Sequence, residues 1–212
     1  MIKIQSFTFN PFQENTYVLH DDSNECLIID PGCYNLEERK ALVDYIEKNA
    51  LTPVKLLNTH AHIDHILGNK FIADKYSLKL EMHQDDVITL ESGKVSASIF
   101  GIDYDESPQP GVFINEGDLI IFGNSQMEIV FTPGHSRGSI CFFNRNEKFI
   151  IGGDVLFLES IGRTDLPGGN HTQLLDSIKN KLFTLADDFT VHPGHGPSTT
   201  IGHEKMYNPF LT

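Results

Sequence analysis

The sequence contains no long apolar segment. No stretch approaches the roughly 20 consecutive apolar residues that a membrane-spanning helix needs, which argues against an integral membrane protein. The N-terminus, Met1 to Phe7, alternates apolar and polar residues as a strand does, with no basic flank followed by an apolar run. We therefore expect no signal peptide and predict a cytoplasmic location.

Cysteines and basic residues are also few. Cys26, Cys33 and Cys141 are scattered and form no C-x-x-C pair. The cysteine pattern therefore indicates neither a disulfide framework nor a thiolate zinc site. Cys26 and Cys141 lie in apolar runs and are expected in the core, whereas Cys33 lies in a loop. The chain has 16 Lys and Arg against 29 Asp and Glu, a formal net charge of −13. This balance argues against nucleic acid or an anionic membrane as a partner, and it does not indicate an oligomeric state.

Apolar residues occur in the amount and pattern of an α/β protein. With 212 residues, 40% of them hydrophobic, and no linker or repeat, we predict a single domain over 1–212. Predicted strands and helices occur in both halves of the chain. Two stacked sheets with the helices outside are the simplest arrangement that buries their apolar faces. Strands are expected at 2–9, 16–20, 26–30, 54–57, 78–82, 112–114, 119–122, 127–131, 140–143, 149–152 and 189–192. Helices are expected after Asn35, at 66–73, from 170 and at 201–207, whereas 83–107 is either a surface excursion, with a possible helix at 84–92, or an active-site rim.

Three histidines and an aspartate occupy six consecutive positions in Thr59-His60-Ala61-His62-Ile63-Asp64-His65. The cluster lies between a buried strand and a helix start, where α/β folds place their chemistry. Alternate residues of an extended segment point the same way, so His60 and His62 can share one metal ion. Asp64 and His65 would project toward a second ion. The pattern favours a metal centre over a solvated polar loop, because few folds have another use for this spacing.

Three later strand ends supply further ligand types. His135 follows Thr132-Pro133-Gly134, Asp154 follows Gly152-Gly153, and His195 follows His192-Pro193-Gly194. His135 would complete a three-imidazole site with His60 and His62. Asp64, His65 and His195, with Asp154 shared, would form a neighbouring site, and seven ligands for two ions are typical of a two-metal hydrolytic centre.

Other polar residues have structural interpretations. Asp30, in an Asp-Pro-Gly turn, is predicted to be structural, with a hydrogen bond to a ligand histidine as the alternative. His192 is interpreted as a core or loop residue rather than a support for a ligand. Four further histidines lie outside the ligand pattern and are expected to be surface or capping residues: His20, His83, His171 and His203.

The four motifs in this order resemble the metallo-β-lactamase superfamily, over nearly the full chain. The resemblance implies an αβ/βα four-layer sandwich with metals at the sheet edge. Three further segments resemble the short, single-domain bacterial members of the glyoxalase II branch: 10–17, 160–165 and 194–204. That likeness implies hydrolysis of a thioester such as S-lactoylglutathione. It also implies that Arg163 contacts the glutathione moiety. A purely structural role for the loop that carries Arg163 is an equally weighted alternative. Longer members carry a further C-terminal helical domain that this sequence lacks, so the resemblance does not identify the thiol carrier.

The residues and the resemblance together predict hydrolysis by two metal ions, and they leave other functions open. Two cations would lower the pKa of a shared water and supply hydroxide, Asp64 would orient it and bind metal, and the thiolate would leave without a strong general acid. Zinc is the expected metal, with iron or manganese also suited to His and Asp ligands. The alternatives are a persulfide dioxygenase with a single iron at the three-histidine site and a metal-binding module without turnover, with a β-lactamase less favoured.

Overall fold

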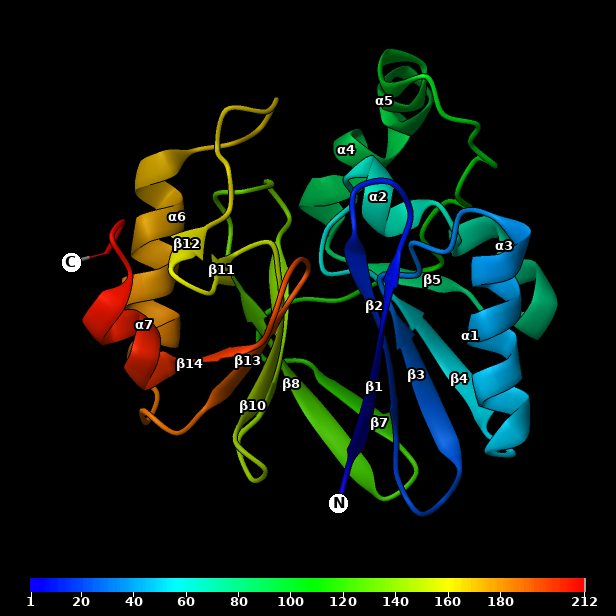
Figure 1. Ribbon diagram of the computed structural model, residues 1–212, viewed down its shortest axis with the longest axis horizontal. Coiled ribbons are helices and arrows are strands. Elements are labelled where there is room, and N and C mark those ends of the chain that lie inside the picture. The colour runs from blue at the N-terminus through cyan, green and yellow to red at the C-terminus, as the bar shows by residue number, and fades with distance from the viewer. Residues whose placement is uncertain (212) are drawn as a thin grey trace.

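Two mixed β-sheets pack face to face in the computed structural model, which describes residues 1–211 (Figure 1). Helices cover the outer face of each sheet, so the layers run helix, sheet, sheet, helix. The predicted αβ/βα four-layer sandwich is confirmed. The last residue of the predicted domain, Thr212, lies outside the described residues.

The first sheet comes from the N-terminal half of the chain, and its strands follow the chain order. They are β1 (Lys3–Phe9), β2 (Glu14–His20), β3 (Glu25–Ile29), β4 (Thr52–Leu57), β5 (Leu80–Met82) and β6 (Val112–Phe113). The first three pair antiparallel, and β3 to β6 pair parallel. Parallel neighbours need crossover connections, here made by α1 (Leu36–Lys48) and α3 (Asn69–Tyr76). Asn35 and Glu38 close the predicted capping box at the start of α1.

The second sheet comes from the C-terminal half, in the order β14-β13-β10-β9-β8-β7. Its strands are β7 (Leu119–Phe122), β8 (Ser125–Phe131), β9 (Ile140–Asn144), β10 (Phe149–Gly153), β13 (Thr190–Pro193) and β14 (Thr199–Thr200). Only β10 and β13 pair parallel, and the connection between them carries the hairpin β11 (Leu156–Phe157) and β12 (Ser160–Ile161), helix α6 (His171–Ser177) and the π-helical turn η2 (Ile178–Leu182). Helix α7 (Ile201–Tyr207) follows β14.

The strand sequences explain the layered packing, because successive side chains point to opposite faces. In β9, Ile140 and Phe142 pack between the two sheets, whereas Cys141 and Phe143 pack toward α6 and α7. In β3, Leu27 and Ile29 face the second sheet, and the alternate residues face α1 and α3. Both faces are covered, so these strands read as continuous apolar runs rather than as alternating ones.

Several element boundaries differ from the predictions by one or two residues, and one helix differs more. The segment predicted as a helix at 66–73 forms two helices, α2 (Ile63–Ile66) and α3, separated at Leu67 and Gly68. Gly68 donates its N–H to Pro31 O at 2.7 Å, and a Cβ there would lie 2.5 Å from Cys33 Sγ. The break therefore comes from close packing against the loop after β3, which local helical spacing does not reveal.

The undecided stretch after His83 contains three short helical segments and no long helix. They are the 3₁₀ turn η1 (Gln84–Asp86), α4 (Val87–Glu91) and α5 (Gly93–Phe100), which lie at the top of the view in Figure 1. The two-residue strands β11, β12 and β14 were not predicted, because a pair of residues carries no periodic signal; β6, equally short, was predicted because Val112, Phe113 and Ile114 form an apolar run.

Burial corrects one expectation, for His20, and confirms others. His20, expected at the surface or at a cap, is buried, with Nε2 3.0 Å from Tyr45 Oη. Cys33 is buried as well, although it lies in a loop, and all three cysteines are free thiols in the interior. His83 caps η1 by accepting a hydrogen bond from Asp85 N, as a capping role requires. Within residues 1–211, no helix has the length and apolar character to span a bilayer.

The interface between the sheets makes a testable contribution to stability. Phe142 is fully buried between the sheets, so Phe142→Ala should lower the free energy of unfolding by about 3–5 kcal/mol through a cavity and lost apolar burial. Ile121→Ala in β7, where 61% of the side chain is exposed, should change it by less than about 0.5 kcal/mol. Denaturant unfolding of both variants checks this, and equal losses would show that the core is not centred between the sheets.

Candidate metal centre

The predicted ligands lie where four strands end along one edge of the two sheets. Strand β4 leads into the cluster His60–His65, and β8, β10 and β13 lead into His135, Asp154 and His195. Backbone hydrogen bonds join the sheets at this edge, from Ile140 N to Thr59 O at 2.9 Å and from Asn15 N to Gly194 O at 2.7 Å. Segments far apart in the sequence are thereby held side by side.

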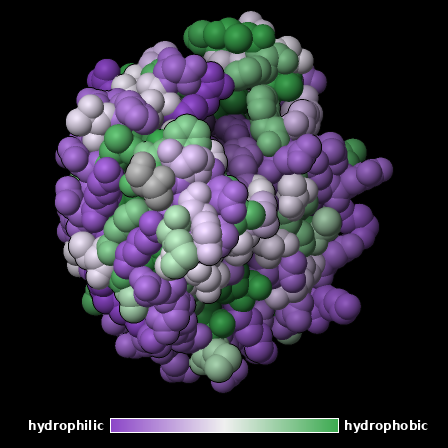
Figure 2. Space-filling view, turned by 60° about the vertical axis from the view of Figure 1, so that its left-hand side comes forward, coloured by the Kyte–Doolittle hydropathy of each residue, from purple (hydrophilic) through white to green (hydrophobic). Residues whose placement is uncertain are grey.

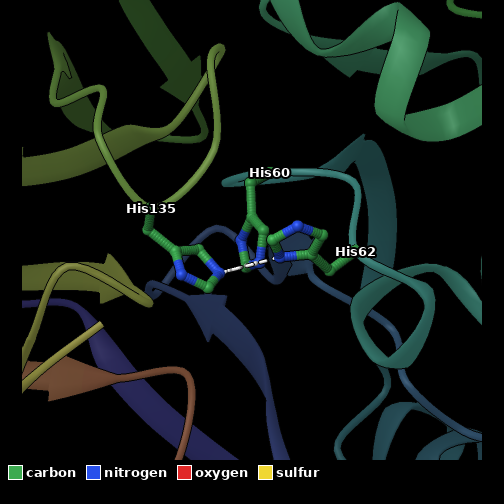
Figure 3. Close-up of side chains that lie close together, drawn as sticks. All are labelled: His60, His62 and His135. Carbon is green, nitrogen blue, oxygen red and sulfur yellow. Dashed lines mark hydrogen bonds between the residues drawn. The ribbon is translucent and has the colours of Figure 1, made fainter. Parts of the chain in front are cut away.

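Three imidazoles converge in the first group (Figure 3). His60 and His62 come from one loop and His135 from another, and the rings point toward one another. His135 Nε2 lies 2.8 Å from His62 Nδ1 and 3.2 Å from His60 Nε2. Their candidate ligand atoms all lie within 4.8 Å of one another, a spacing that allows one cation to contact all three.

Asp64, His65 and His195 form the second group, also within 4.8 Å of one another. His195 Nε2 lies 3.0 Å from Asp64 Oδ2, and His65 Nε2 lies 3.7 Å from the same oxygen. Helix α2 starts at Ile63, so Asp64 and His65 project from its first turn, away from the extended His60–His62 segment.

Asp154 lies between the two groups. Its carboxylate oxygens are 3.5 Å from His65 Nε2, 3.5 Å from His135 Nε2 and 3.6 Å from His195 Nε2. The structure therefore brings together all seven residues that the sequence singled out, and it places Asp154 where a shared ligand would lie.

The buried polar atoms of the centre fit a cation. His65 Nε2 and Asp154 Oδ1 are buried and have no hydrogen-bond partner among the described residues. Leaving such groups without a partner costs about 1–3 kcal/mol each, and more when they are charged. A divalent cation at this point would satisfy both atoms, and imidazole with carboxylate is a donor set that zinc, iron and manganese all accept.

The two groups differ in protonation. Burial, reinforced by neighbouring histidines, lowers the pKa of His60 well below its ordinary value and that of His62 to about 4. Burial alone would lower the pKa of His65, but Asp64 and Asp154 raise it well above the ordinary value. Burial would likewise lower the pKa of His195, but its hydrogen bond to Asp64 raises it. Near neutral pH, His60 and His62 are therefore neutral, ready to bind a cation, whereas His65 holds a proton.

The other ring nitrogen of several candidate ligands is held by the protein. His135 Nδ1 donates to Arg163 O at 2.8 Å, and His195 Nδ1 donates to Phe12 O at 3.1 Å. His65 Nδ1 lies 3.1 Å from Asp30 Oδ2. These contacts select the tautomer and orient each Nε2 toward the centre. The alternative prediction for Asp30, a hydrogen bond to a ligand histidine, is confirmed.

Asp30 also holds the segment that carries His60. It accepts hydrogen bonds from Thr59 N at 2.7 Å and Thr59 Oγ1 at 2.5 Å. Asp30 has a left-handed backbone, with φ of 49°. Asp30, His60 and His65 also form a third group of potential ligands, but the Asp30 oxygens are already engaged by Thr59, which favours a supporting role.

Two buried acids at the centre were missed by the sequence interpretation. Asp86, in η1, accepts from Ala61 N at 2.5 Å, from Gly138 N at 3.1 Å and from the Ser136 hydroxyl, and so ties the His62 loop to the His135 loop. Glu14, at the start of β2, is fully buried, and its Oε1 lies 3.9 Å from His65 Nδ1. Glu14 lies in the segment 10–17 that carries part of the family resemblance, whereas Asp86 lies in no motif, and no local pattern marks either acid as buried.

Five of the seven candidate ligands line a cavity of about 680 Å³: His62, Asp64, His135, Asp154 and His195. Residues of α4 and α5 line one side, so the stretch 83–107 contributes to an active-site rim rather than to a detached excursion. Arg163 lines the cavity as well, and its guanidinium donates to both Asp165 carboxylate oxygens at 2.7 Å. His192, with Nδ1 2.9 Å from Ser198 Oγ, does not line it.

A family model for the metallo-beta-lactamase superfamily matches residues 9–195. The chain belongs to that superfamily. Relatives align over nearly its whole length. "Probable metallo-hydrolase YqgX" of Bacillus subtilis is 39% identical over 99% of this chain and 98% of its own. "Hydroxyacylglutathione hydrolase GloC" of Haemophilus influenzae is 35% identical with the same coverage.

Solved structures of the superfamily have the same fold. The BLEG-1 B3 metallo-beta-lactamase superposes with a TM-score of 0.90 and 38% identity, covering both chains fully. TTHA1623 in a di-iron-bound form superposes with a TM-score of 0.87 and 33% identity, and the match covers 98% of this chain and all of that protein. ETHE1 from Myxococcus xanthus superposes with a TM-score of 0.81 and 25% identity, and the match covers 98% of this chain and 83% of that protein. The metallo-beta-lactamase fold is thus shown, and members of this superfamily bind divalent metals, often in pairs.

The contact between Asp30 and His65 predicts a loss of metal affinity without unfolding. Asp30→Asn keeps the size and tolerates the left-handed backbone, but it removes the carboxylate that orients His65. Affinity for the second of two added zinc ions should fall about 10- to 100-fold, measured by competition with a chelating dye. Asp22→Asn, at an exposed position, is the control. Unchanged affinity in Asp30→Asn would contradict an orienting role.

The raised pKa of His65 predicts proton release at the second group. Below that pKa a cation must displace the proton, so affinity for the ion at Asp64, His65 and His195 should rise with pH, about tenfold per unit for each proton released. His60 and His62, with lowered pKa values, have no proton to lose near neutrality. Calorimetric zinc titration in buffers of different ionisation enthalpy measures the protons, and equal release at both steps would contradict the assignment.

Proposed function

We propose that the protein is a metal-dependent hydrolase that cleaves a thioester such as S-lactoylglutathione, with two divalent cations held by the seven residues of the centre. The observation that carries this proposal is that Asp154 lies between two candidate ligand groups, each with members that line the same cavity. The unpartnered atoms of His65 and Asp154 support occupancy of the second group, not of the three-histidine group alone. GloC, named as a hydroxyacylglutathione hydrolase, is among the full-length relatives.

His60, His62 and His135 would hold one cation, and Asp64, His65 and His195 the other, with Asp154 shared. When bound, two such cations lower the pKa of water toward neutrality and polarise a carbonyl oxygen. Zinc is the proposed metal, and iron or manganese suits the same donors.

The side chains of this protein have separate tasks in the proposed reaction. Burial would raise the pKa of Asp64, but His65 and the hydrogen bond with His195 lower it below its ordinary value, so Asp64 stays a carboxylate that accepts a hydrogen bond from attacking water. Arg163, on the cavity wall, would bind an anionic part of the thiol carrier. Water adds to the thioester carbonyl, the C–S bond breaks, and the sulfur leaves as thiolate, which needs no strong acid because an ordinary thiol has a pKa of about 8.5.

Two other reactions are candidates on specific grounds. The likeness to ETHE1 and the closeness of the three histidines are compatible with a persulfide dioxygenase that uses a single iron. The likeness to BLEG-1 makes β-lactam hydrolysis a candidate, because amide opening needs the same two ligand groups. A metal-binding module without turnover is less favoured, since the ligand set is complete. A small-molecule substrate accords with the acidic balance of the chain, which disfavours nucleic acid, and we retain a cytoplasmic location as a proposal.

Substitutions in the centre should separate chemistry from folding. His62→Ala and Asp64→Ala should each abolish S-lactoylglutathione hydrolysis, because each removes a ligand from a different group, while circular dichroism shows a folded protein. His171→Ala, at an exposed histidine, should keep full activity. Hydrolysis that survives removal of Asp64 and His65 together would disprove the two-metal mechanism.

Metal content measured on the same sample distinguishes the candidates. About two ions per chain with thioester hydrolysis supports the proposal, whereas one iron per chain with oxygen uptake on glutathione persulfide supports the dioxygenase. Turnover of β-lactams but not of thioesters would support the β-lactamase. A protein loaded with zinc, iron or manganese that is inert on all of these substrates would revive the non-catalytic interpretation.

A further inference from the structure

One wall of the cavity is apolar and strongly exposed. Ile88 in α4, with Val95, Ile99 and Phe100 in α5, are each more than half exposed, Ile99 to 75%, and all four line the cavity. In Figure 2 an apolar patch lies at the top of the molecule, where Figure 1 places α5. Contiguous exposed apolar surface of this kind usually marks a binding site.

The spacing of residues in α5 shows that one helix face is directed to the cavity. Ser92, the N-cap of α5, and the helix residues Val95, Ser96 and Ile99 recur at i, i+3, i+4 and i+7, and all four line the cavity. The opposite side of α5 is anchored, since Ala97 is buried in the core. The two serines are small and leave room beside the apolar side chains.

The apolar wall continues to the metal centre. The rings of Phe100 and Phe12 meet edge to face with centroids 5.0 Å apart, and Phe12 O accepts the hydrogen bond from His195. Phe157, on another side of the cavity, has its ring centroid 6.3 Å from that of His195. A ligand with its reacting carbonyl at the centre would therefore have aromatic and aliphatic surface within reach.

Two arginines line the same cavity. Arg163 is paired with Asp165, whereas Arg137 is exposed and has no carboxylate within ion-pair distance in the described part of the chain. Arg137 packs beside Gly168, where a Cβ would lie 3.1 Å from its Cγ. In a chain with net charge −13, two guanidinium groups at one cavity point to an anionic ligand.

We infer that the cavity selects thioesters with an apolar acyl group on an anionic thiol carrier. The acyl chain lies along Val95, Ile99 and Phe100, and the anionic groups of the carrier contact Arg137 and Arg163. This inference rests on the proposed thioester hydrolysis and specifies its substrate class. A lactoyl group is small and polar and would leave the apolar wall uncovered. The reaction remains balanced: water gives its oxygen to the carbonyl carbon, the C–S bond breaks, and the thiolate takes up a proton.

Hydrolysis of a homologous series tests the acyl preference. With the zinc-loaded protein, kcat/KM for acetyl, butanoyl and hexanoyl thioesters of glutathione and of coenzyme A should rise about two- to fourfold per added methylene on at least one carrier, past the value for the lactoyl thioester. Ile99→Ser should remove much of that gain. The matched control Ile121→Ser makes the same change at an exposed position outside the cavity and should leave the series unaltered.

Binding of unreactive analogues tests the same surface without turnover. The affinities of S-methyl, S-butyl and S-hexyl thioethers of both carriers, measured by calorimetry, should rise with chain length, and Ile99→Ser should flatten the rise. Arg137→Gln should weaken all members by a similar factor and leave the slope unchanged.

The two measurements separate the two proposals. Chain-length-dependent binding without hydrolysis of any thioester would refute the proposed function and retain the apolar subsite. If the protein hydrolyses thioesters but kcat/KM stays constant or falls with acyl chain length on both carriers, the proposed function stands and the acyl preference is wrong. Flat or absent binding in both thioether series would also overturn it.

Discussion

The structure depends on the burial of polar side chains at the seam between two apolar sheets. His60, His65 and His135 are buried there, so each of these imidazoles needs a partner within the protein or at a cation. Asp30 contacts Nδ1 of His65, and the carbonyl oxygens of Arg163 and Phe12 accept from Nδ1 of His135 and His195. Two buried atoms without a hydrogen-bond partner, His65 Nε2 and Asp154 Oδ1, lie 3.5 Å apart. A divalent cation bound here would displace the His65 proton and give both atoms a partner.

The apolar layers make this arrangement possible. Strands such as β3 and β9 are buried on both faces, which positions their ends rigidly relative to each other. The candidate ligands extend from the ends of β4, β8, β10 and β13 in the same two sheets, and backbone hydrogen bonds between the sheets join them at this edge. The packed core, rather than the loops, thus fixes the relative positions of candidate ligands that come from both halves of the chain.

The cavity above the centre divides two roles between different parts of the fold. The five candidate ligands that line the cavity follow the ends of β4, β8, β10 and β13. The apolar wall belongs to α4 and α5, short helices inserted between β5 and β6. Helix α5 therefore contributes side chains to the cavity wall and none to the candidate ligands.

The sequence by itself determined the layered α/β architecture, most strands to within two residues, and all seven candidate ligands. Those features are local: apolar runs, a capping box at Asn35, and histidines and aspartates directly after strands. Tertiary structure alone decided the rest. Glu14 and Asp86 look like surface acids until the fold buries them, and Gly68 breaks a helix only because Cys33 packs against it. The segment 83–107 has weak local preferences, and only its packing over the centre makes it a cavity wall. Contacts between residues distant in the chain leave no periodic trace in the sequence, which is why these features appeared only in the folded protein.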